Sequence, residues 1–131
     1  KNVLIEFYVL DFAPGCEVAH QTRRLAYKKF QAVDTEILGI SVFSPYAQLA
    51  FAKTLDLPYP LLSDFPNLET VKKFGVENTI GKVTTAKRSY FLVDKKGIVR
   101  FKRIMSPANP EAPFLANEVL LEEIRKIDQG Y

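Results

Sequence analysis

The sequence predicts a three-layer α/β fold in which a central mixed sheet is flanked by helices, and three observations support this prediction. Strand-like apolar segments alternate with segments of helical periodicity over the first part of the chain. Two further strand-like segments then follow each other across a short turn with a glycine, which is typical of a β-hairpin. An amphipathic segment comes last. Parallel strands joined by helical crossovers, followed by a hairpin and a helix, produce such a sandwich.

The bulk composition is that of one globular domain spanning residues 1–131. Hydrophobic residues make up 47% and charged residues 25% of the chain, which is long enough to bury a substantial core. The net charge of +3 is mild, and basic and acidic residues are interleaved. We therefore expect neither nucleic acid nor a membrane as a partner. No apolar run approaches the length of a membrane-spanning helix, and we expect no signal peptide before the first strand.

Residues 3–16 organise the rest of the chain. Residues 3–9 form an apolar run broken only by Glu6, which is typical of a central strand covered on both faces. A Pro-Gly loop then brings Cys16, the only cysteine, to the start of a helix. Unpaired N–H groups and the positive end of the helix dipole at such a position favour a thiolate over a thiol.

The helix that begins near Gly15 is predicted to be amphipathic. Its apolar residues recur every three or four positions, and its basic residues occupy the other side. We expect the basic side to be solvated and His20, one turn beyond Cys16, to be exposed as well. The predicted apolar side consists of Val18, Thr22, Leu25, Ala26, Phe30 and Val33, and the predicted basic side of Arg23, Arg24, Lys28 and Lys29.

The middle of the chain continues the alternation. Residues 37–43 are predicted to form a second buried strand. Ser44 is a suitable N-cap and Pro45 a suitable first-turn residue for a helix that extends to about Leu55.

A less regular part follows. Residues 61–63 are predicted to be extended, and residues 67–74 to form a short helix that Gly75 ends in a left-handed conformation. Residues 76–87 contain Gly, Asn, Lys and Thr without an apolar rhythm, and we predict a loop.

The last third is predicted to contain a hairpin and a helix. Residues 89–93 and 98–104 flank Asp94-Lys95-Lys96-Gly97, and residues 105–113 are irregular. The terminal helix is marked by Val119, Leu120, Leu121, Ile124 and Ile127. Functional groups in sheets of this kind lie beyond the carboxyl ends of the strands, where the loop of residues 10–15 places Cys16.

With a strand, a loop, a cysteine and a helix in this order, the chain resembles the peroxiredoxins of the alkyl hydroperoxide reductase and thiol-specific antioxidant superfamily. It is most similar to the bacterioferritin-comigratory and related one-cysteine branches. The resemblance extends over nearly the whole chain and implies a thioredoxin-like fold, although the N-terminal extension usual in the family has no counterpart in residues 1–131. It is carried by FYVLDFAPGC, by EILGISVFSPYAQLAFAKTLDLPYPLLSDF and by AKRSYFLVDKKGIVRF.

The catalytic motif of the family is only partly present. The family pattern is Pro, three residues, Thr, two residues and Cys, and these places hold Val9, Ala13 and Cys16. In the family the proline shields the thiolate, and the threonine hydroxyl hydrogen-bonds the peroxide. Arg88 matches the family arginine that stabilises the thiolate and orients the peroxide. Arg24 matches a second helix arginine of the family, but its basic neighbours Arg23, Lys28 and Lys29 favour a solvated helix face for it.

The resemblance implies a thiol peroxidase that reduces hydrogen peroxide or small organic hydroperoxides through a sulfenic acid. Cys16 and Arg88 are the implied catalytic residues. The loop residues Ala13, Pro14 and Gly15 are the implied peroxide-binding residues, because backbone N–H groups can cradle the oxygens whatever the side chains are. We expect no cofactor and no metal.

The partners follow from the same reasoning. With Gln21 at the place of the resolving cysteine of related branches, an external thiol has to reduce the sulfenic acid. A single cysteine makes a reducing compartment the expected location, and we predict the cytoplasm. Ten Phe and six Tyr residues are mostly core, but some can cover a homodimer surface, as peroxiredoxins often pair.

Two other functions remain open at this point. The changes at Val9, Ala13 and Ala19 favour a catalytically silent peroxiredoxin-like domain that serves as a binding or structural module. That alternative predicts a Cys16 that is buried and slow toward alkylating agents, since a lone cysteine is often a small buried hydrophobic residue. The third class, a thioredoxin-like disulfide reductase, is disfavoured because its Cys-x-x-Cys motif would need a cysteine at Ala13.

Overall fold

A computed structural model describes residues 1–105 and 114–130. Its elements are β1 (Asn2–Phe7), α1 (Pro14–Leu25), α2 (Tyr27–Ala32), β2 (Thr35–Ser41), α3 (Pro45–Leu55), β3 (Leu61–Ser63), α4 (Glu69–Lys73), β4 (Glu77–Ile80), β5 (Val83–Ala86), β6 (Ser89–Val93), β7 (Val99–Ile104) and α5 (Asn117–Asp128). The predicted irregular residues 106–113 lie outside the described part.

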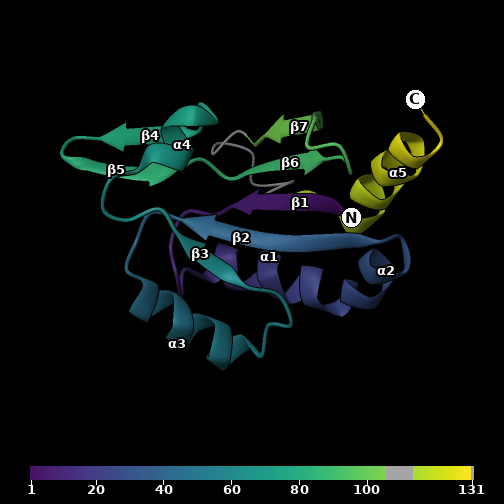
Figure 1. Ribbon diagram of the computed structural model, residues 1–131. Helices are drawn as coiled ribbons and strands as arrows, with labels where there is room; N and C mark the ends of the chain where they lie inside the picture. Colours follow the sequence, from purple (N-terminus) through teal and green to yellow (C-terminus); the bar gives the residue numbers. More distant parts are fainter. Residues whose placement is uncertain (106–113, 131) are drawn as a thin grey trace.

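Five strands form one mixed sheet in the order β3-β2-β1-β6-β7 (Figure 1). β1, β2 and β3 are parallel, and β6 and β7 pair antiparallel. β1 is the central strand, as the apolar run predicts, but it ends at Phe7 and not at Val9. The mixed sheet flanked by helices that the sequence predicts is confirmed.

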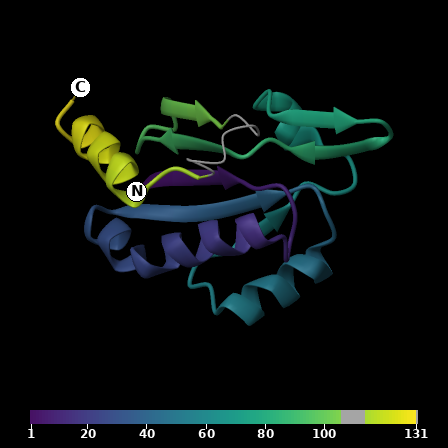
Figure 2. The ribbon, with the colours of Figure 1, turned by 180° about the vertical axis from the view of Figure 1, so that it is seen from behind.

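Most of the helices pack on one face of the sheet. Leu4 of β1 and its partner Leu92 of β6 point to this face, where they pack with Phe30 of α2 and with Leu120 and Ile124 of α5. α1 and α3 cover the part of this face near the end of β1 (Figure 2).

The opposite face is covered by α4 and by the segment around the second, two-stranded sheet. Phe7 and Phe91 pack there with Val71 of α4, Val76 and Ala86 of β5. The two aromatic rings of this pair meet edge to face, with centroids 5.7 Å apart. The sheet therefore has apolar cores on both faces, which is the three-layer arrangement that the sequence predicts.

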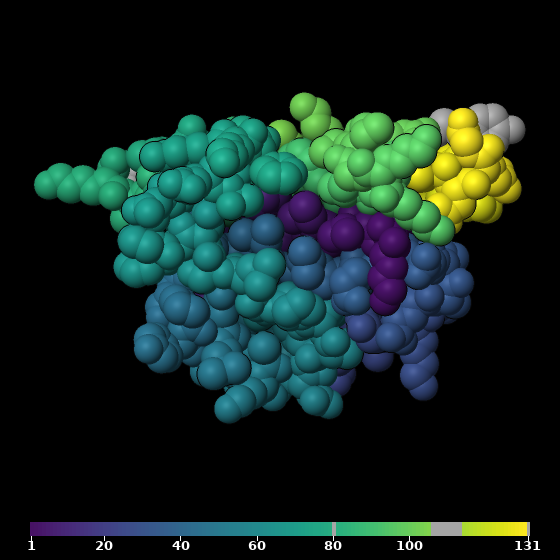
Figure 3. Space-filling model, viewed as in Figure 1, coloured from purple at the N-terminus to yellow at the C-terminus, as the bar shows by residue number. Residues whose placement is uncertain are grey.

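The prediction of a loop over residues 76–87 is wrong, because β4 and β5 form a hairpin there. Gly81 turns the chain in a left-handed conformation with φ of 62°. The Oγ1 atoms of Thr79 and Thr84 lie 2.9 Å apart across the strands. Strands with mostly polar side chains show no apolar alternation, so the sequence carries little signal for them. The end of this hairpin projects from the molecular surface (Figure 3).

The predicted apolar side of the first helix is also wrong in its first half. Val18 is 49% and Leu25 80% exposed, whereas the buried residues of α1 are Cys16, Ala19, His20 and Arg23. The helix also ends at Leu25, and α2 begins after Ala26. Ala26 and Phe30, in the second half of the prediction, are buried as expected.

The other predicted elements lie where the sequence places them, within a few residues. The Ser44 side chain caps α3 by accepting from the N–H of Tyr46 at 3.1 Å. Gly75 follows α4 with φ of 69°. α5 lies beside the start of β1 (Figures 1 and 2). The Asn2 amide donates there to Asp128, the last residue of α5, at 3.0 Å. Within residues 1–105 and 114–130, every helix is too short or too polar to cross a membrane.

Candidate active site

A tight loop connects β1 to α1 and sets the start of the helix. The Tyr8 hydroxyl donates to Asp11 Oδ1 at 2.7 Å, and both side chains are buried. Phe12 has a φ of 65°, a left-handed conformation that costs a bulky residue about 1–3 kcal/mol. Ala13 then returns to an extended conformation as the N-cap, and Pro14 is the first residue of α1.

Two backbone N–H groups at the start of α1 are free to bind a ligand. Glu17 N–H donates to the Ala13 carbonyl at 2.9 Å, and Ala13 N–H donates to the Leu10 carbonyl at 3.4 Å. In the described part of the chain, the N–H groups of Gly15 and Cys16 have no acceptor. Among the three residues predicted to bind peroxide, Gly15 therefore presents a free N–H group, Ala13 uses its own within the loop, and Pro14 has none.

The Arg88 guanidinium lies against the Cys16 sulfur. Arg88 Nη2 donates to Cys16 Sγ at 3.3 Å. The pairing of Phe7 with Ser89 places Arg88 level with the end of β1, so the side chain reaches the start of α1. A Cβ built on Gly15 would lie 3.5 Å from the same Nη2 atom. A cation at hydrogen-bond distance favours the thiolate form of a cysteine.

The Cys16 side chain is also enclosed by apolar groups. It is 1% exposed and belongs to a buried cluster with Tyr8, Phe51 and Leu55, against which Val9, Ala13, Leu57 and Leu61 pack. The burial agrees with what a silent domain predicts, whereas the contact with Arg88 agrees with what a peroxidase predicts. A reactant therefore has to be small, or the loop has to move, for the sulfur to be reached.

His20 is buried, so the prediction that it is exposed is wrong. Its Nδ1 atom lies 2.7 Å from the Tyr59 hydroxyl, and its ring meets Tyr8 edge to face with centroids 4.6 Å apart. Burial lowers the pKa of His20 to about 3, and the positive charges of Arg88 and Arg23 act in the same direction. The imidazole behind the site is therefore neutral. The sequence could not indicate this, because Tyr59 is 39 residues away.

Arg23 is fully buried, so its predicted place on a solvated face is wrong as well. It forms an ion pair with Glu6 of β1 through Nε, and Nη2 donates to the Leu115 carbonyl at 2.7 Å. Its third partner is the Asn117 side chain at the start of α5. Burial raises the pKa of Glu6, and the charge of Arg23 opposes that rise. The sequence contained one indication of this ion pair: Glu6 is the single charged residue in an apolar strand, and a buried carboxylate needs a cation beside it.

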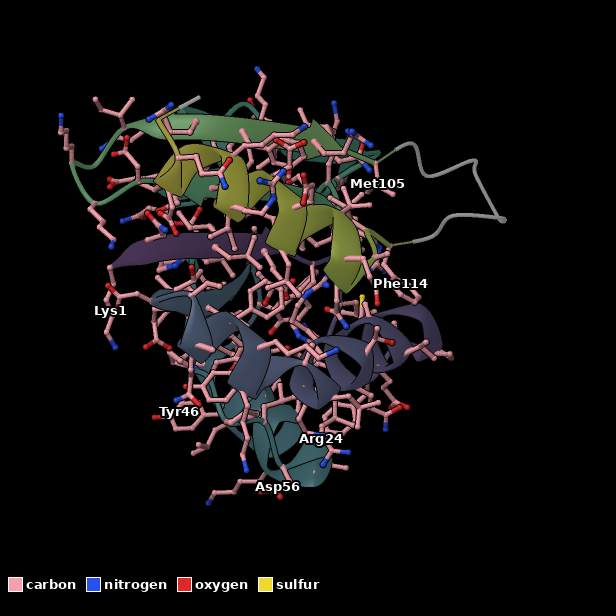
Figure 4. The ribbon with its side chains drawn as sticks, turned by 90° about the vertical axis from the view of Figure 1, so that its right-hand side faces the viewer. Lys1, Arg24, Tyr46, Asp56, Met105 and Phe114 are labelled. Atoms are coloured by element: carbon pink, nitrogen blue, oxygen red, sulfur yellow. The ribbon has the colours of Figure 1, made fainter. Side chains whose placement is uncertain are left out.

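Arg24 lies apart from these groups, in a surface hollow that it lines with Tyr27, Lys28 and Asp56. Figure 4 shows Arg24 and Asp56 close together. The described residues give no contact between Arg24 and Cys16 or Arg88, which favours the interpretation of Arg24 as a surface residue. In the same part of the chain, no group of three His, Cys, Asp or Glu side chains is arranged to hold a metal ion.

The sequence is similar to known proteins over most of its length. Residues 1–102 match the model of the AhpC/TSA family. The chloroplastic peroxiredoxin Q of Populus jackii is 38% identical over 100 residues, which cover 76% of this chain and 46% of that protein. The chain spans about half the length of the curated relatives it matches.

Solved structures have the same architecture. The peroxidoxin BcpB of Mycobacterium tuberculosis superimposes with a TM-score of 0.83 at 29% identity, covering 96% of this chain and 79% of the other. AhpC of Enterococcus faecalis superimposes with a TM-score of 0.84 at 25% identity, covering 99% and 78%. The family match and these superpositions together show that the chain belongs to the AhpC/TSA family of the peroxiredoxin superfamily and has its thioredoxin-like fold.

Proposed function

We propose that the chain is a one-cysteine thiol peroxidase domain that reduces hydrogen peroxide or small organic hydroperoxides. The observation that supports this most strongly is the 3.3 Å contact between Arg88 Nη2 and Cys16 Sγ at the start of α1. Membership of the AhpC/TSA family and the similarity to peroxiredoxin Q support the same reaction.

The reaction begins with the Cys16 thiolate. Its sulfur attacks the terminal oxygen of R–O–O–H, an S–O bond forms and the O–O bond breaks. The leaving oxygen takes a proton and departs as water or an alcohol, and the cysteine becomes a sulfenic acid. Arg88 stabilises the negative charge on sulfur before attack and the charge that develops on the leaving oxygen during it.

The peroxide oxygens have fewer donors here than in the family motif. Ala13 has no hydroxyl, so we assign the binding of the oxygens to the N–H groups of Gly15 and Cys16 and to Arg88. The loss of one preorganised donor costs about 10²- to 10³-fold in rate. The domain is accordingly expected to be slower than a peroxidase with the complete motif, but faster than a free thiol.

The sulfenic acid is reduced by an external thiol, because Cys16 is the only cysteine in the sequence. The first thiol displaces water to give a mixed disulfide, and a second thiol releases Cys16 and leaves as a disulfide. This chemistry needs a reducing compartment, and the cytoplasm remains our prediction, although the peroxiredoxin Q relatives are chloroplastic. A homodimer also remains a prediction. Tyr46 and Phe65, which are exposed, are candidates for its surface.

Trapping of the intermediate tests the proposed function. The protein is treated with hydrogen peroxide and with cumene hydroperoxide in the presence of dimedone, and the adduct on Cys16 is measured by mass spectrometry. We expect one adduct at Cys16 with at least one of the two peroxides and none in Cys16→Ser. In a parallel sample without dimedone, peroxide consumption should continue when a small dithiol is added. Absence of the adduct with both peroxides would contradict the proposal.

A catalytically silent binding or structural domain is the second candidate, favoured by the burial of Cys16 and by Ala13. It predicts that, when the protein and free cysteine at the same concentration are each treated with peroxide, Cys16 stays a thiol while the free cysteine is oxidised. The same experiment therefore separates the two functions.

A further inference from the structure

Behind Cys16, a row of charged groups lies between α1 and the sheet. Glu6 of β1 pairs with Tyr90 of β6, and Arg88 is two residues before Tyr90 on the same strand line. Directly paired residues of antiparallel strands share a face, and diagonal neighbours are within reach of long side chains. Glu6 and Arg88 therefore lie on the same face of the sheet, close enough for the charge of Arg88 to act on the Glu6 carboxyl.

The helix contributes the other two members of the row. Cys16 and Arg23 are seven residues apart on α1, about two helical turns, so both face the sheet. Both are buried, and each contacts the sheet group level with it: Cys16 contacts Arg88, and Arg23 contacts Glu6. Along the row, acidic and basic groups alternate: the Cys16 thiol group, the Arg88 guanidinium, the Glu6 carboxyl and the Arg23 guanidinium.

In this order Arg88 lies between two groups that can carry a negative charge, Cys16 and Glu6. A carboxylate accepts two parallel hydrogen bonds from a guanidinium and is its preferred partner. A buried carboxylate without a partner is also costly, so an unpaired Glu6 would draw the nearest cation to it. We propose that Arg23 is a positioning residue for the site: by holding Glu6, it leaves the Arg88 guanidinium on the Cys16 sulfur.

This inference rests on the proposed function only in treating Cys16 as a thiolate. Other ionisable groups also lie around the row. Burial keeps the pKa of His20 at about 3 and raises the pKa values of Tyr8, Tyr59 and Tyr90. Burial also raises the pKa of Asp11, whose carboxylate accepts from Tyr8. Glu17 lies in the first turn of α1, and α3 brings only Phe51 and Leu55 to the Cys16 cluster.

A titration of the thiolate tests the proposal without peroxide. The ultraviolet absorbance of the Cys16 thiolate is followed against pH in the parent chain, Arg23→Gln, Arg23→Lys, Glu6→Gln and the Glu6→Gln/Arg23→Gln double variant. Each variant is also titrated with Cys16→Ser added. Subtraction of that curve removes the absorbance of the ionising tyrosines and leaves that of the Cys16 thiolate. Far-ultraviolet circular dichroism confirms that each variant is folded.

The expected shifts differ in sign. In Arg23→Gln the freed Glu6 takes Arg88 from the sulfur, so the titration midpoint rises by about one pH unit. In Glu6→Gln an unpaired Arg23 cation remains, and the midpoint falls by a smaller amount. The double variant, which has neither charge, and Arg23→Lys, which keeps the cation, return to the parent midpoint.

Two results would overturn the proposal: an unchanged midpoint in Arg23→Gln, or a double variant that keeps the shift of Arg23→Gln, as a purely structural role would produce. If Arg23→Gln does not fold, the comparison of the other variants still decides, because the Glu6→Gln midpoint has to lie below that of the double variant. The proposed function is tested separately, since the titration involves no peroxide and a peroxide-inactive protein would still give all five curves.

Discussion

α1 and α5 are helices of equal length that pack on the same face of the sheet, yet they bury different kinds of side chain. α5 buries Leu120 and Ile124. α1 buries Cys16, His20 and Arg23, and leaves its last residue, Leu25, 80% exposed. The apolar face of α5 contributes stability, whereas the polar face of α1 holds the groups that we assign to chemistry.

The difference shows what decides which face of a helix is buried. A polar or charged group is buried at acceptable cost only when a partner satisfies it. On α1 the partners come from distant parts of the chain: Arg88 for Cys16, Tyr59 for the Nδ1 atom of His20 and Glu6 for Arg23. The face of α5 needs no such partners, because leucine and isoleucine are buried wherever the core is apolar.

The largest effect is expected at the chemical end of α1. Arg88→Gln removes the cation from Cys16, and we expect the second-order rate constant with peroxide to fall by about 10²- to 10³-fold. The matched control is Arg103→Gln, which removes an exposed arginine of β7 whose guanidinium lies 5.7 Å from the centre of the Phe101 ring. Equal rates in the two variants would show that Arg88 does not take part in the reaction.

A second experiment compares the two helices in stability. Leu120→Ala should lower the free energy of unfolding by about 2–5 kcal/mol, because the leucine is fully buried. Leu25→Ala, the same substitution at an exposed position of α1, should change it by less than about 0.5 kcal/mol. Urea denaturation measures both. A loss in Leu25→Ala as large as that in Leu120→Ala would contradict the assignment of the buried faces.

A third comparison concerns the pH dependence that His20 on α1 gives to stability. Burial lowers its pKa from the ordinary 6.5 to about 3 in the fold, so the unfolded chain binds more protons than the folded one between these pH values. The contribution of His20 to stability is therefore complete above pH 6.5 and is lost as the pH falls toward 3, by up to about 1.4 kcal/mol per pH unit.

The control for this pH dependence is His20→Gln, which keeps a polar side chain but does not titrate. The difference in free energy of unfolding between the parent chain and the variant should shrink as the pH falls from 6.5 to 4. If the difference stays constant over that range, His20 is not held neutral in the folded protein.

The sequence predicts most of the fold because most of its signals are local. Alternating strand and helix segments, the Ser44-Pro45 helix start and the glycine after α4 each depend on a few neighbouring residues. The sequence does not indicate the β4–β5 hairpin, because its mostly polar strands have no apolar period. The pairing of Cys16 with Arg88 could be anticipated from the resemblance to peroxiredoxins. The burial of His20 could not, and that of Arg23 is indicated by Glu6 alone.

Buried polar residues are harder to predict than apolar ones because their partners come from distant parts of the chain. Such pairs leave no periodic pattern in the sequence, whereas buried apolar residues do. Arg23 has the same sequence surroundings as Arg24, and only one of the two lies opposite Glu6. The lone glutamate in the central strand was the available clue, because a buried carboxylate requires a buried cation.

The most direct test of the account is the rate at which Cys16 reacts with peroxide. Stopped-flow mixing of the reduced protein with hydrogen peroxide and with an organic hydroperoxide at neutral pH gives the second-order rate constants, with free cysteine as the reference and Cys16→Ser as the blank. We predict a rate constant at least about 10²-fold above that of free cysteine for one of the peroxides, because Arg88 and the N–H groups of α1 stabilise the charge on sulfur and oxygen. Rate constants no greater than that of free cysteine for both peroxides would contradict the account.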